Sequence, residues 1–278
     1  MENRQGEKSH CRSVTRIFFI LNTFHSGGFG CQGGFKFQPM RYLLTVGINK
    51  YLRSAFGGQN IDLKQCVNDA TRTHTELSPF CDMVQLLDDE NATRAEIIAC
   101  LKYYAGQCKA GDTFIYHQSS HGTMWYNADG SVTNARVVHD GVLADHQIAP
   151  ILASFVKGVT VITLSDLCHS ESSQRSPFSP AEYARARSME YRGNTPPKPT
   201  ELNLNYAATI YHLSACQFDQ VAWETAQGGV FTTLFLDVLK QTKGERSIKT
   251  IFKTVARNIR NQTPALEIIN PSRKAPKL

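Results

Sequence analysis

Runs of apolar and β-branched residues alternate with amphipathic helical patterns along residues 41–261. The strand-like runs lie at 42–48, 83–87, 113–117, 159–164 and 208–213. Helical patterns lie at 61–77, 145–156, 230–239 and 247–261. A further helical pattern follows residue 94, with apolar positions at 97, 98, 101 and 104. Asn91 or Thr93 can cap this helix. The alternation predicts an α/β domain with a mainly parallel sheet and helices on both faces.

Three segments depart from this alternation. Residues 1–39 are rich in glycine and polar residues, and two interpretations stay open: a disordered leader, or a misassigned upstream segment before a true start at Met40. Residues 171–206 hold five of the eleven prolines and are predicted to be an exposed loop inside the domain. The domain itself is placed at 40–262, and 263–278 is expected to be a frayed basic tail.

The composition excludes several classes of protein. Hydrophobic residues make up 41% of the 278 residues and charged residues 19%, which argues against a disordered chain and against a membrane bundle. The longest apolar run near the N-terminus, residues 17–21, is too short to span a bilayer, and no small-residue cleavage site follows it. Eight cysteines without CxxC spacing favour a reduced compartment, so we expect a cytoplasmic protein that binds no membrane.

The net charge of +6 comes from the C-terminal part, where residues 242–278 hold nine basic and two acidic side chains. A basic segment of this kind can bind nucleic acid or an anionic membrane. The basic positions 249, 253, 257 and 260 follow an apolar stripe at helical spacing, which is typical of the solvated edge of a docked helix. We therefore expect no nucleic-acid partner. The oligomeric state stays open, with a monomer favoured.

Two predicted buried strands lead into residues suited to nucleophilic chemistry. The run at 113–117 continues into Gln-Ser-Ser-His-Gly with His121, and the run at 159–164 continues into Ser-Asp-Leu-Cys-His with Cys168. Ligand sites of open α/β sheets form outside the carboxyl ends of the strands. A cysteine attacks a carbonyl as a thiolate, and an imidazole beside it can take and return the proton. The 47 residues between His121 and Cys168 suit two strand ends joined by one crossover helix.

Each residue alone has a simpler explanation. A cysteine at a strand end is most often a small buried hydrophobe, and a His-Gly pair is most often a turn. Both residues together, in this order and spacing, favour catalysis. A zinc site built from His117, His121, Cys168 and His169 lacks ligand pairs at zinc-site spacing, so no metal site is expected.

At these residues the sequence resembles the metacaspases and related caspase-like cysteine peptidases, over most of residues 41–261. The resemblance is carried by 42–49, Cys-Val-Asn-Asp-Ala at 66–70, Asn-Ala-Thr-Arg at 91–94, Ser-Ser-His-Gly at 119–122, Asp-Leu-Cys-His-Ser at 166–170, Ser-Ala-Cys-Gln at 214–217 and Gly-Gly-Val-Phe-Thr at 228–232. A histidine about 50 residues before the cysteine is also the order found in caspases. Ser120 and Glu171 stand where the family has glycine, and Leu167 stands where it has serine.

The resemblance implies a caspase–haemoglobinase-like fold, a three-layer α/β sandwich whose mainly parallel central sheet has about six strands and helices on both faces. It implies a cysteine endopeptidase in which His121 and Cys168 form the catalytic dyad. The backbone N–H groups of Gly122 and Cys168 are then the candidates for stabilising the oxyanion. The alternative is a catalytically weak or inactive caspase-like scaffold or regulatory module, and the presence of both dyad residues favours the enzyme.

The resemblance also implies cleavage after Arg or Lys, with Asp69, Asp166 and Ser119 as substrate-binding residues. A pair of carboxylates is a good receptor for a guanidinium group. The alternatives are a helix-surface charge for Asp69 and a turn former for Asp166. Basic residues in the 171–206 loop would make the chain a substrate of its own active site, unless they are simply solvated.

Calcium is the one cofactor that the resemblance raises. Many metacaspases bind it through acidic residues that follow the His-Gly motif, where this chain keeps Asp129, Asp140 and Asp145. His146 stands where the family often has a second aspartate, and calcium needs six or more oxygen ligands. Three scattered aspartates are too few to predict a site, so no cofactor is expected, and calcium activation stays an open alternative.

Overall fold

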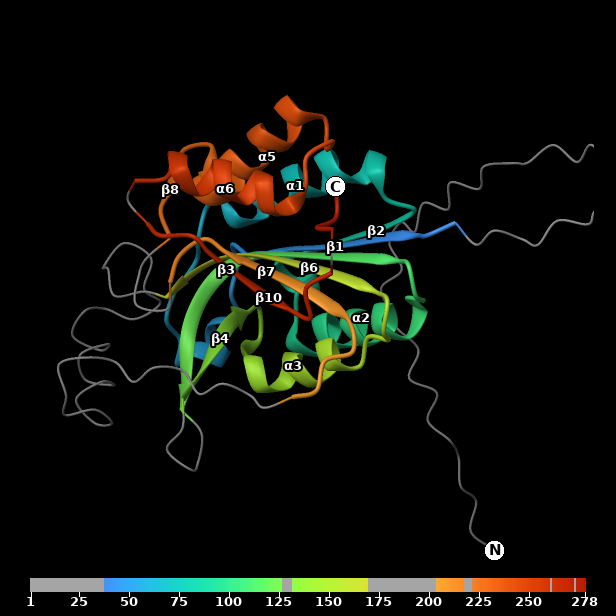
Figure 1. The fold of residues 1–278 in the computed structure, drawn as a ribbon. Helices are drawn as coiled ribbons and strands as arrows, with labels where there is room; N and C mark the ends of the chain where they lie inside the picture. Colours follow the sequence, from blue (N-terminus) through green and yellow to red (C-terminus); the bar gives the residue numbers. More distant parts are fainter. Residues whose placement is uncertain (1–37, 127–131, 170–203, 218–221, 261, 273) are drawn as a thin grey trace, which may run out of the picture.

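The computed structural model describes residues 38–126, 132–169, 204–217, 222–260, 262–272 and 274–278. Its centre is a sheet with the strand order β10-β7-β6-β3-β1-β2, flanked by helices on both faces (Figure 1). The parallel strands are β1 (Arg41–Gly47), β2 (Met83–Asp88), β3 (Thr113–Tyr126), β6 (Thr160–His169) and β7 (Thr209–Ser214). The antiparallel strands are β10 (Ala265–Ile269) on β7, β4 (Val132–Val138) on β3 and β5 (Gly141–Ala144) on β4. The predicted three-layer α/β sandwich is confirmed.

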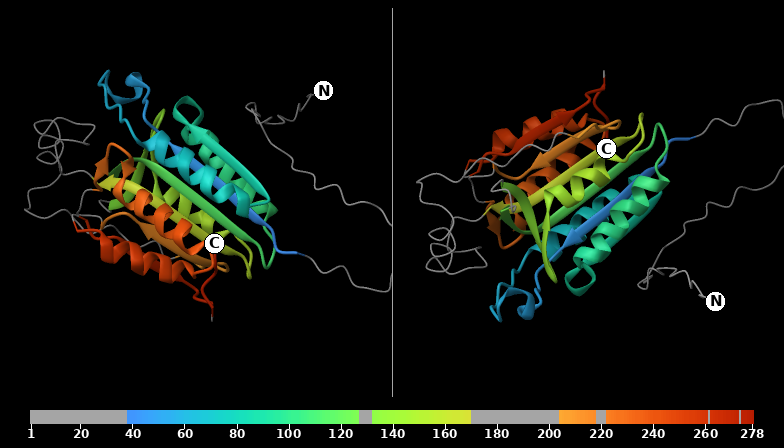
Figure 2. Two further views of the ribbon diagram at one scale, coloured as in Figure 1. Left: turned by 90° about the horizontal axis from the view of Figure 1, so that it is seen from above. Right: turned by 90° about the horizontal axis from the view of Figure 1, so that it is seen from below.

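Helices α1 (Cys66–Leu77), α5 (Val230–Thr242) and α6 (Ile248–Asn258) cover one face of the sheet, and α2 (Arg94–Gln107) and α3 (Asp145–Ala153) cover the other (Figure 2). Short 3-10 helices lie at η1 (Arg53–Phe56), η2 (Ser78–Phe80) and η3 (Asp89–Asn91). Two very short strands, β8 (Glu224–Thr225) and β9 (Gly228–Gly229), form a separate hairpin before α5. Of the two predicted caps for α2, Thr93 is the N-cap, and its hydroxyl accepts a hydrogen bond from the N–H of Glu96 at 3.2 Å. In the part of the chain that the structure describes, no helix has the length and apolar character to span a bilayer.

The parallel strands are apolar on both faces because each face packs into its own core. In β1, Leu43 contributes to the core under α1, α5 and α6, and Leu44 contributes to the core under α2 and α3. Both side chains are completely buried. Burial of a leucine side chain stabilises a fold by about 1.5–3 kcal/mol, so continuous apolar runs are favourable only in strands that are covered twice.

Two strands are longer than their apolar runs. β3 continues through His121 and Gly122 to Tyr126 because β4 pairs with this extension, and β6 continues through Cys168 to His169 because it pairs with β3. The His-Gly pair therefore lies inside a strand, and its interpretation as a turn is wrong. Asp166 lies inside β6 and is not a turn former.

The C-terminal residues are ordered against the domain, so the prediction of a frayed tail is wrong for the residues described there. β10 forms the edge of the sheet, the N–H of Ile248 donates to the carbonyl of Pro276 at 2.8 Å, and Leu278 is buried. The predicted leader and nearly all of the predicted 171–206 loop lie outside the described residues, so both stay predictions.

Candidate active site

The register of two parallel strands places the predicted dyad residues next to each other. His121 of β3 is the Cα partner of Cys168 of β6, and Ser119 is the partner of Asp166. Neighbouring strands lie about 4.8 Å apart, so these residues occupy adjacent positions on the sheet. Gly122, the next residue of β3, pairs with His169 of β6 and Arg136 of β4. The backbone of Cys168 is described and its side chain is not, so the catalytic roles stay predictions.

Main-chain and tyrosine contacts hold the imidazole of His121, which is buried. Its Nε2 lies 2.8 Å from the carbonyl oxygen of Ile61, and this oxygen can only accept, so Nε2 carries the proton. The hydroxyl of Tyr51 accepts a hydrogen bond from the N–H of His121 at 3.1 Å and donates to the carbonyl of Ile48 at 3.2 Å. The two rings pack with their centroids 5.3 Å apart. In this tautomer Nδ1 is the ring nitrogen that can take a proton.

The three predicted substrate-binding residues come together on the α1–α5 face of the sheet. Asp69 lies in the first turn of α1 and Asp166 in β6, and their exposed fractions are 1% and 2%. The hydroxyl of Ser119 donates to Oδ2 of Asp69 at 3.1 Å. The burial of Asp69 excludes its interpretation as a helix-surface charge. Asp69 and Asp166 are called the acid pair below.

The N-terminus of α5 closes over the acid pair. The N–H of Gly229 lies 3.0 Å from both carboxylate oxygens of Asp69, and the N–H and hydroxyl of Thr232 donate to Oδ2 of Asp166 at 3.2 and 2.7 Å. Gly229 is the N-cap of α5 and has no side chain to cap it, so carboxylates from other elements accept the hydrogen bonds of the first turn. A Cβ at Gly229 would lie 2.1 Å from Oδ2 of Asp166 and 3.1 Å from Oδ2 of Asp69. Gly229 therefore lies between the two acids.

Side chains of α1 hold the β8–β9 hairpin in this closed position. The carbonyl of Gln227 accepts hydrogen bonds from Nη1 of Arg72 at 2.8 Å and from Nδ2 of Asn68 at 2.9 Å. Arg72 also donates to the hydroxyl of Thr233 at 3.0 Å. These contacts join α1, the hairpin and the start of α5 around the acid pair.

A neutral histidine lies behind Thr232. The Nε2 of His117 is 3.4 Å from the Thr232 hydroxyl, which itself donates to Asp166, so the hydroxyl accepts from Nε2. Burial lowers the pKa of His117 to about 3. His117 therefore brings no positive charge to the acid pair at neutral pH.

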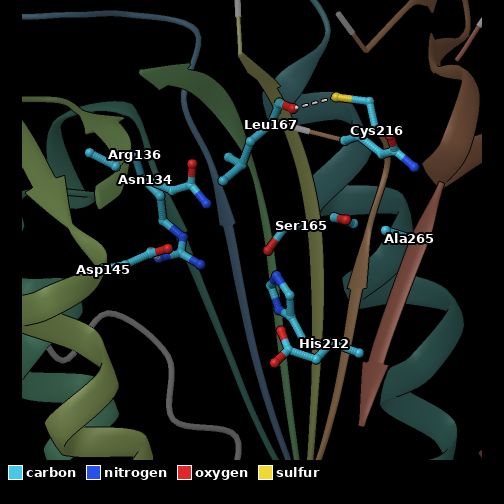
Figure 3. Close-up of a pocket in the computed structure, with 12 residues that line it drawn as sticks. Asn134, Arg136, Asp145, Ser165, Leu167, His212, Cys216 and Ala265 are labelled. Atoms are coloured by element: carbon cyan, nitrogen blue, oxygen red, sulfur yellow. Dashed lines mark hydrogen bonds and ion pairs between the residues drawn. The ribbon is translucent and has the colours of Figure 1, made fainter. Parts of the chain in front are cut away.

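A cavity of about 490 Å³ lies on the opposite, α2–α3 face of the sheet (Figure 3). Asn134, Arg136 and Asp145 face Ser165 and His212 across this space. Arg136 is buried and forms an ion pair with Asp145 at 2.8 Å. The cavity reaches the residue before the predicted nucleophile, where the Cys216 thiol donates to the carbonyl of Leu167 at 3.5 Å. Because the acid pair lies on the other face, this cavity is not the predicted pocket for a basic side chain.

The two candidate calcium ligands that the structure describes are bound by other protein groups. Asp140 accepts a hydrogen bond from the N–H of Arg94 at 2.7 Å, Asp145 pairs with Arg136, and Asp129 lies outside the described residues. Among the residues described, no three His, Cys, Asp or Glu side chains are grouped to hold a metal ion. The described residues alone do not form a calcium site, and we derive no step through one.

Sequence reasoning missed five groups of this site. The carbonyl of Ile61 and the N–H of Gly229 are main-chain groups, which side-chain motifs do not reveal. Tyr51 and His117 belong to no motif with an assigned role. Thr232 lies in the Gly-Gly-Val-Phe-Thr segment that resembles the family, and this segment was the available signal.

The fold and the site together define the class of protein. The chain belongs to the caspase domain family, whose model matches residues 40–276. It is 27% identical to metacaspase-1 of Ajellomyces capsulatus (strain NAm1 / WU24) over 175 residues, which are 54% of this chain and 48% of the relative. It is 27% identical to inactive metacaspase-4 of Trypanosoma brucei brucei over 199 residues, which are 64% of this chain and 54% of the relative. The chain thus spans about half the length of these relatives.

A crystal structure of the protein GSU0716 from Geobacter sulfurreducens is similar in fold. The two superpose with a TM-score of 0.71 at 24% sequence identity, over 84% of this chain and 96% of the other. At this identity the likeness concerns the fold alone.

Proposed function

We propose that this protein is a cysteine endopeptidase that hydrolyses peptide bonds after arginine and, less efficiently, after lysine. The observation that carries the proposal is the pairing of His121 with Cys168 on neighbouring strands, with Nε2 of the imidazole held by a main-chain carbonyl. A base that a third group orients beside a nucleophile is the usual arrangement of nucleophilic catalysis. Membership of the caspase domain family supports the same chemistry.

In the proposed reaction Nδ1 of His121 takes the thiol proton of Cys168, and the thiolate attacks the substrate carbonyl carbon. A C–S bond forms and the carbonyl electrons move to oxygen, where the N–H groups of Gly122 and Cys168 are proposed to donate. The C–N bond then breaks as His121 gives its proton to the leaving amine. Water, deprotonated by His121, attacks the thioester and releases the acid and the thiol.

The acid pair is proposed to hold the basic side chain of the substrate. Asp69 and Asp166 lie on the face of the sheet toward which alternate residues of β3 and β6 point, and Ser119 adds a hydroxyl there. Because both carboxylates are buried under Gly229, binding requires this residue to move. Basic residues of the 171–206 loop, outside the described residues, are then candidate sites of self-cleavage.

Peptide amides with Arg, Lys or Asp before a fluorogenic leaving group test this function. We expect turnover of the Arg substrate first, the Lys substrate more slowly and the Asp substrate not at all. Cys168→Ala should abolish turnover, and Cys81→Ala, at a partly buried cysteine after η2, is the matched control. Turnover of Asp substrates alone would refute the acid-pair assignment, and full activity of Cys168→Ala would refute the nucleophile.

One observation favours a second candidate, an inactive caspase-like scaffold. The acid pair is occupied by the protein's own backbone, and a relative that matches 64% of this chain is named an inactive metacaspase. The same assay separates the two functions. A scaffold gives no Cys168-dependent turnover of any peptide, including peptides with the sequence of the 171–206 loop.

A further inference from the structure

We propose that Gly229 and Thr232, at the N-terminus of α5, determine the selectivity of the acid pair for arginine over lysine. They occupy the two carboxylates when no substrate is present, so that a side chain binds only by replacing their hydrogen bonds. The inference rests on the proposed function, because it concerns the residue before the cleaved bond.

The protein's own donors make the acid pair a closed site. Three donors from α5 point at the carboxylates: the N–H of Gly229 on Asp69, and the N–H and hydroxyl of Thr232 on Asp166. All four residues are buried. A buried carboxylate that loses its donors is strongly destabilised, so a substrate group must supply new ones as these leave.

Arginine and lysine differ in how well they replace these donors. A guanidinium carries five N–H donors in a rigid plane, and it can serve two carboxylates at once. An ammonium carries three donors on one atom and is more strongly hydrated. Lysine therefore replaces fewer of the hydrogen bonds that Gly229 and Thr232 give up than arginine does.

The part of this segment that carries Gly229 is independent of the main sheet. The β8–β9 hairpin pairs only with itself, and it consists of two residues in each strand. Gly228 has a φ of +132°, a conformation that glycine adopts without strain. The side chains of Asn68 and Arg72 hold the exposed residue Gln227, whose carbonyl can exchange them for water. The hairpin can therefore shift while β3 and β6 keep their register.

Substitutions at the two residues test the inference through the ratio of kcat/KM for Arg and Lys substrates. In Gly229→Ala the new Cβ lies 2.1 Å from Oδ2 of Asp166, so the closed contact cannot form. Thr232→Val removes the hydroxyl donor at constant shape, and Thr232→Ser restores it. We expect the ratio to fall about fivefold in Gly229→Ala and Thr232→Val, as for the loss of one hydrogen bond, and to recover in Thr232→Ser. Gly106→Ala in α2, with nothing within 4 Å of its Cβ, is the control and should keep the ratio.

A second measurement does not depend on turnover. In Cys168→Ala protein, amide hydrogen exchange of peptides that cover residues 224–236 is followed with butylguanidine or pentylamine added. Butylguanidine should raise exchange at Gly229 and Thr232 far more than pentylamine does. The proposed function would stand and the inference would fall if Arg substrates were cleaved while both the ratio and the exchange stayed unchanged. Absence of Arg cleavage would refute the proposed function, and an unchanged exchange rate would then overturn the inference as well.

Discussion

Replacing Asp69 by alanine tests whether a buried carboxylate of α1 stabilises the start of α5. Asp69 accepts hydrogen bonds from the hydroxyl of Ser119 and the N–H of Gly229, and only 1% of it is exposed. A hydrogen bond to a charged group contributes about 1.5–3 kcal/mol, and a donor left buried without a partner costs about 1–3 kcal/mol. Relief of repulsion between the two acids offsets part of this loss, so we expect the free energy of unfolding to fall by about 3 kcal/mol.

Urea unfolding at neutral pH, followed by circular dichroism, measures this loss. Asp69→Asn keeps one oxygen acceptor and should recover about half of the stability, since a neutral acceptor forms the weaker hydrogen bond. Asp237→Ala, at an exposed position of α5, is the matched control and should change stability by less than about 0.5 kcal/mol. A loss below about 1 kcal/mol in Asp69→Ala would refute the capping role.

Three further predictions concern the buried polar groups around the site. Tyr51→Phe removes the hydroxyl that binds the N–H of His121 and the carbonyl of Ile48, so kcat should fall about tenfold at similar KM, as expected when a catalytic base is displaced. Tyr103→Phe, at an exposed tyrosine, is the control and should leave kcat unchanged. Equal kcat values in the two variants would contradict this prediction. Burial lowers the pKa of His117 from 6.5 to about 3, so the unfolded chain binds a proton that the folded chain does not between these values. The contribution of His117 to the free energy of unfolding is therefore constant above pH 6.5 and falls by up to about 1.4 kcal/mol per pH unit below it. His117→Asn should make the free energy of unfolding in urea less dependent on pH between 6.5 and 3. An unchanged pH dependence in this variant would refute the lowered pKa of His117. Arg136→Met leaves Asp145, whose side chain is 38% exposed, to be solvated by water, so it should cost about 1 kcal/mol in urea unfolding, and a cost above about 3 kcal/mol would contradict this reasoning.

The fold was predictable where the residues of a single strand indicate its burial without knowledge of its partners. The apolar runs of β1 and β6 predict doubly covered strands because burial on both faces leaves no polar alternation. The extension of β3 to Tyr126 carries polar residues, and its stability comes from β4, a partner that only the folded chain supplies. β10 was missed for a similar reason, since it is a short edge strand whose pairing with β7 is long-range.

The site was predictable as far as side chains define it. His121 and Cys168 follow recognisable strands, and Asp69 and Asp166 lie in motifs, so their convergence was expected. The closure of the acid pair was not, because its donor on Asp69 is the main-chain N–H of Gly229. A glycine in a sequence indicates conformational freedom and small size, and only the coordinates show which atoms it lets approach.

The central claim is that His121 activates Cys168 as a nucleophile. The most direct test is the rate at which Cys168 reacts with a peptidyl electrophile that carries Arg, compared between the native protein and His121→Ala. Burial raises the pKa of Cys81 and Cys108 to about 12, so these thiols are protonated at neutral pH and react slowly. We predict that peptide mass mapping finds Cys168 labelled first in the native protein, by more than about a hundredfold over these two cysteines, and that His121→Ala removes this excess. Labelling of Cys168 at the rate of Cys81, or an excess that survives in His121→Ala, would contradict an imidazole-activated nucleophile.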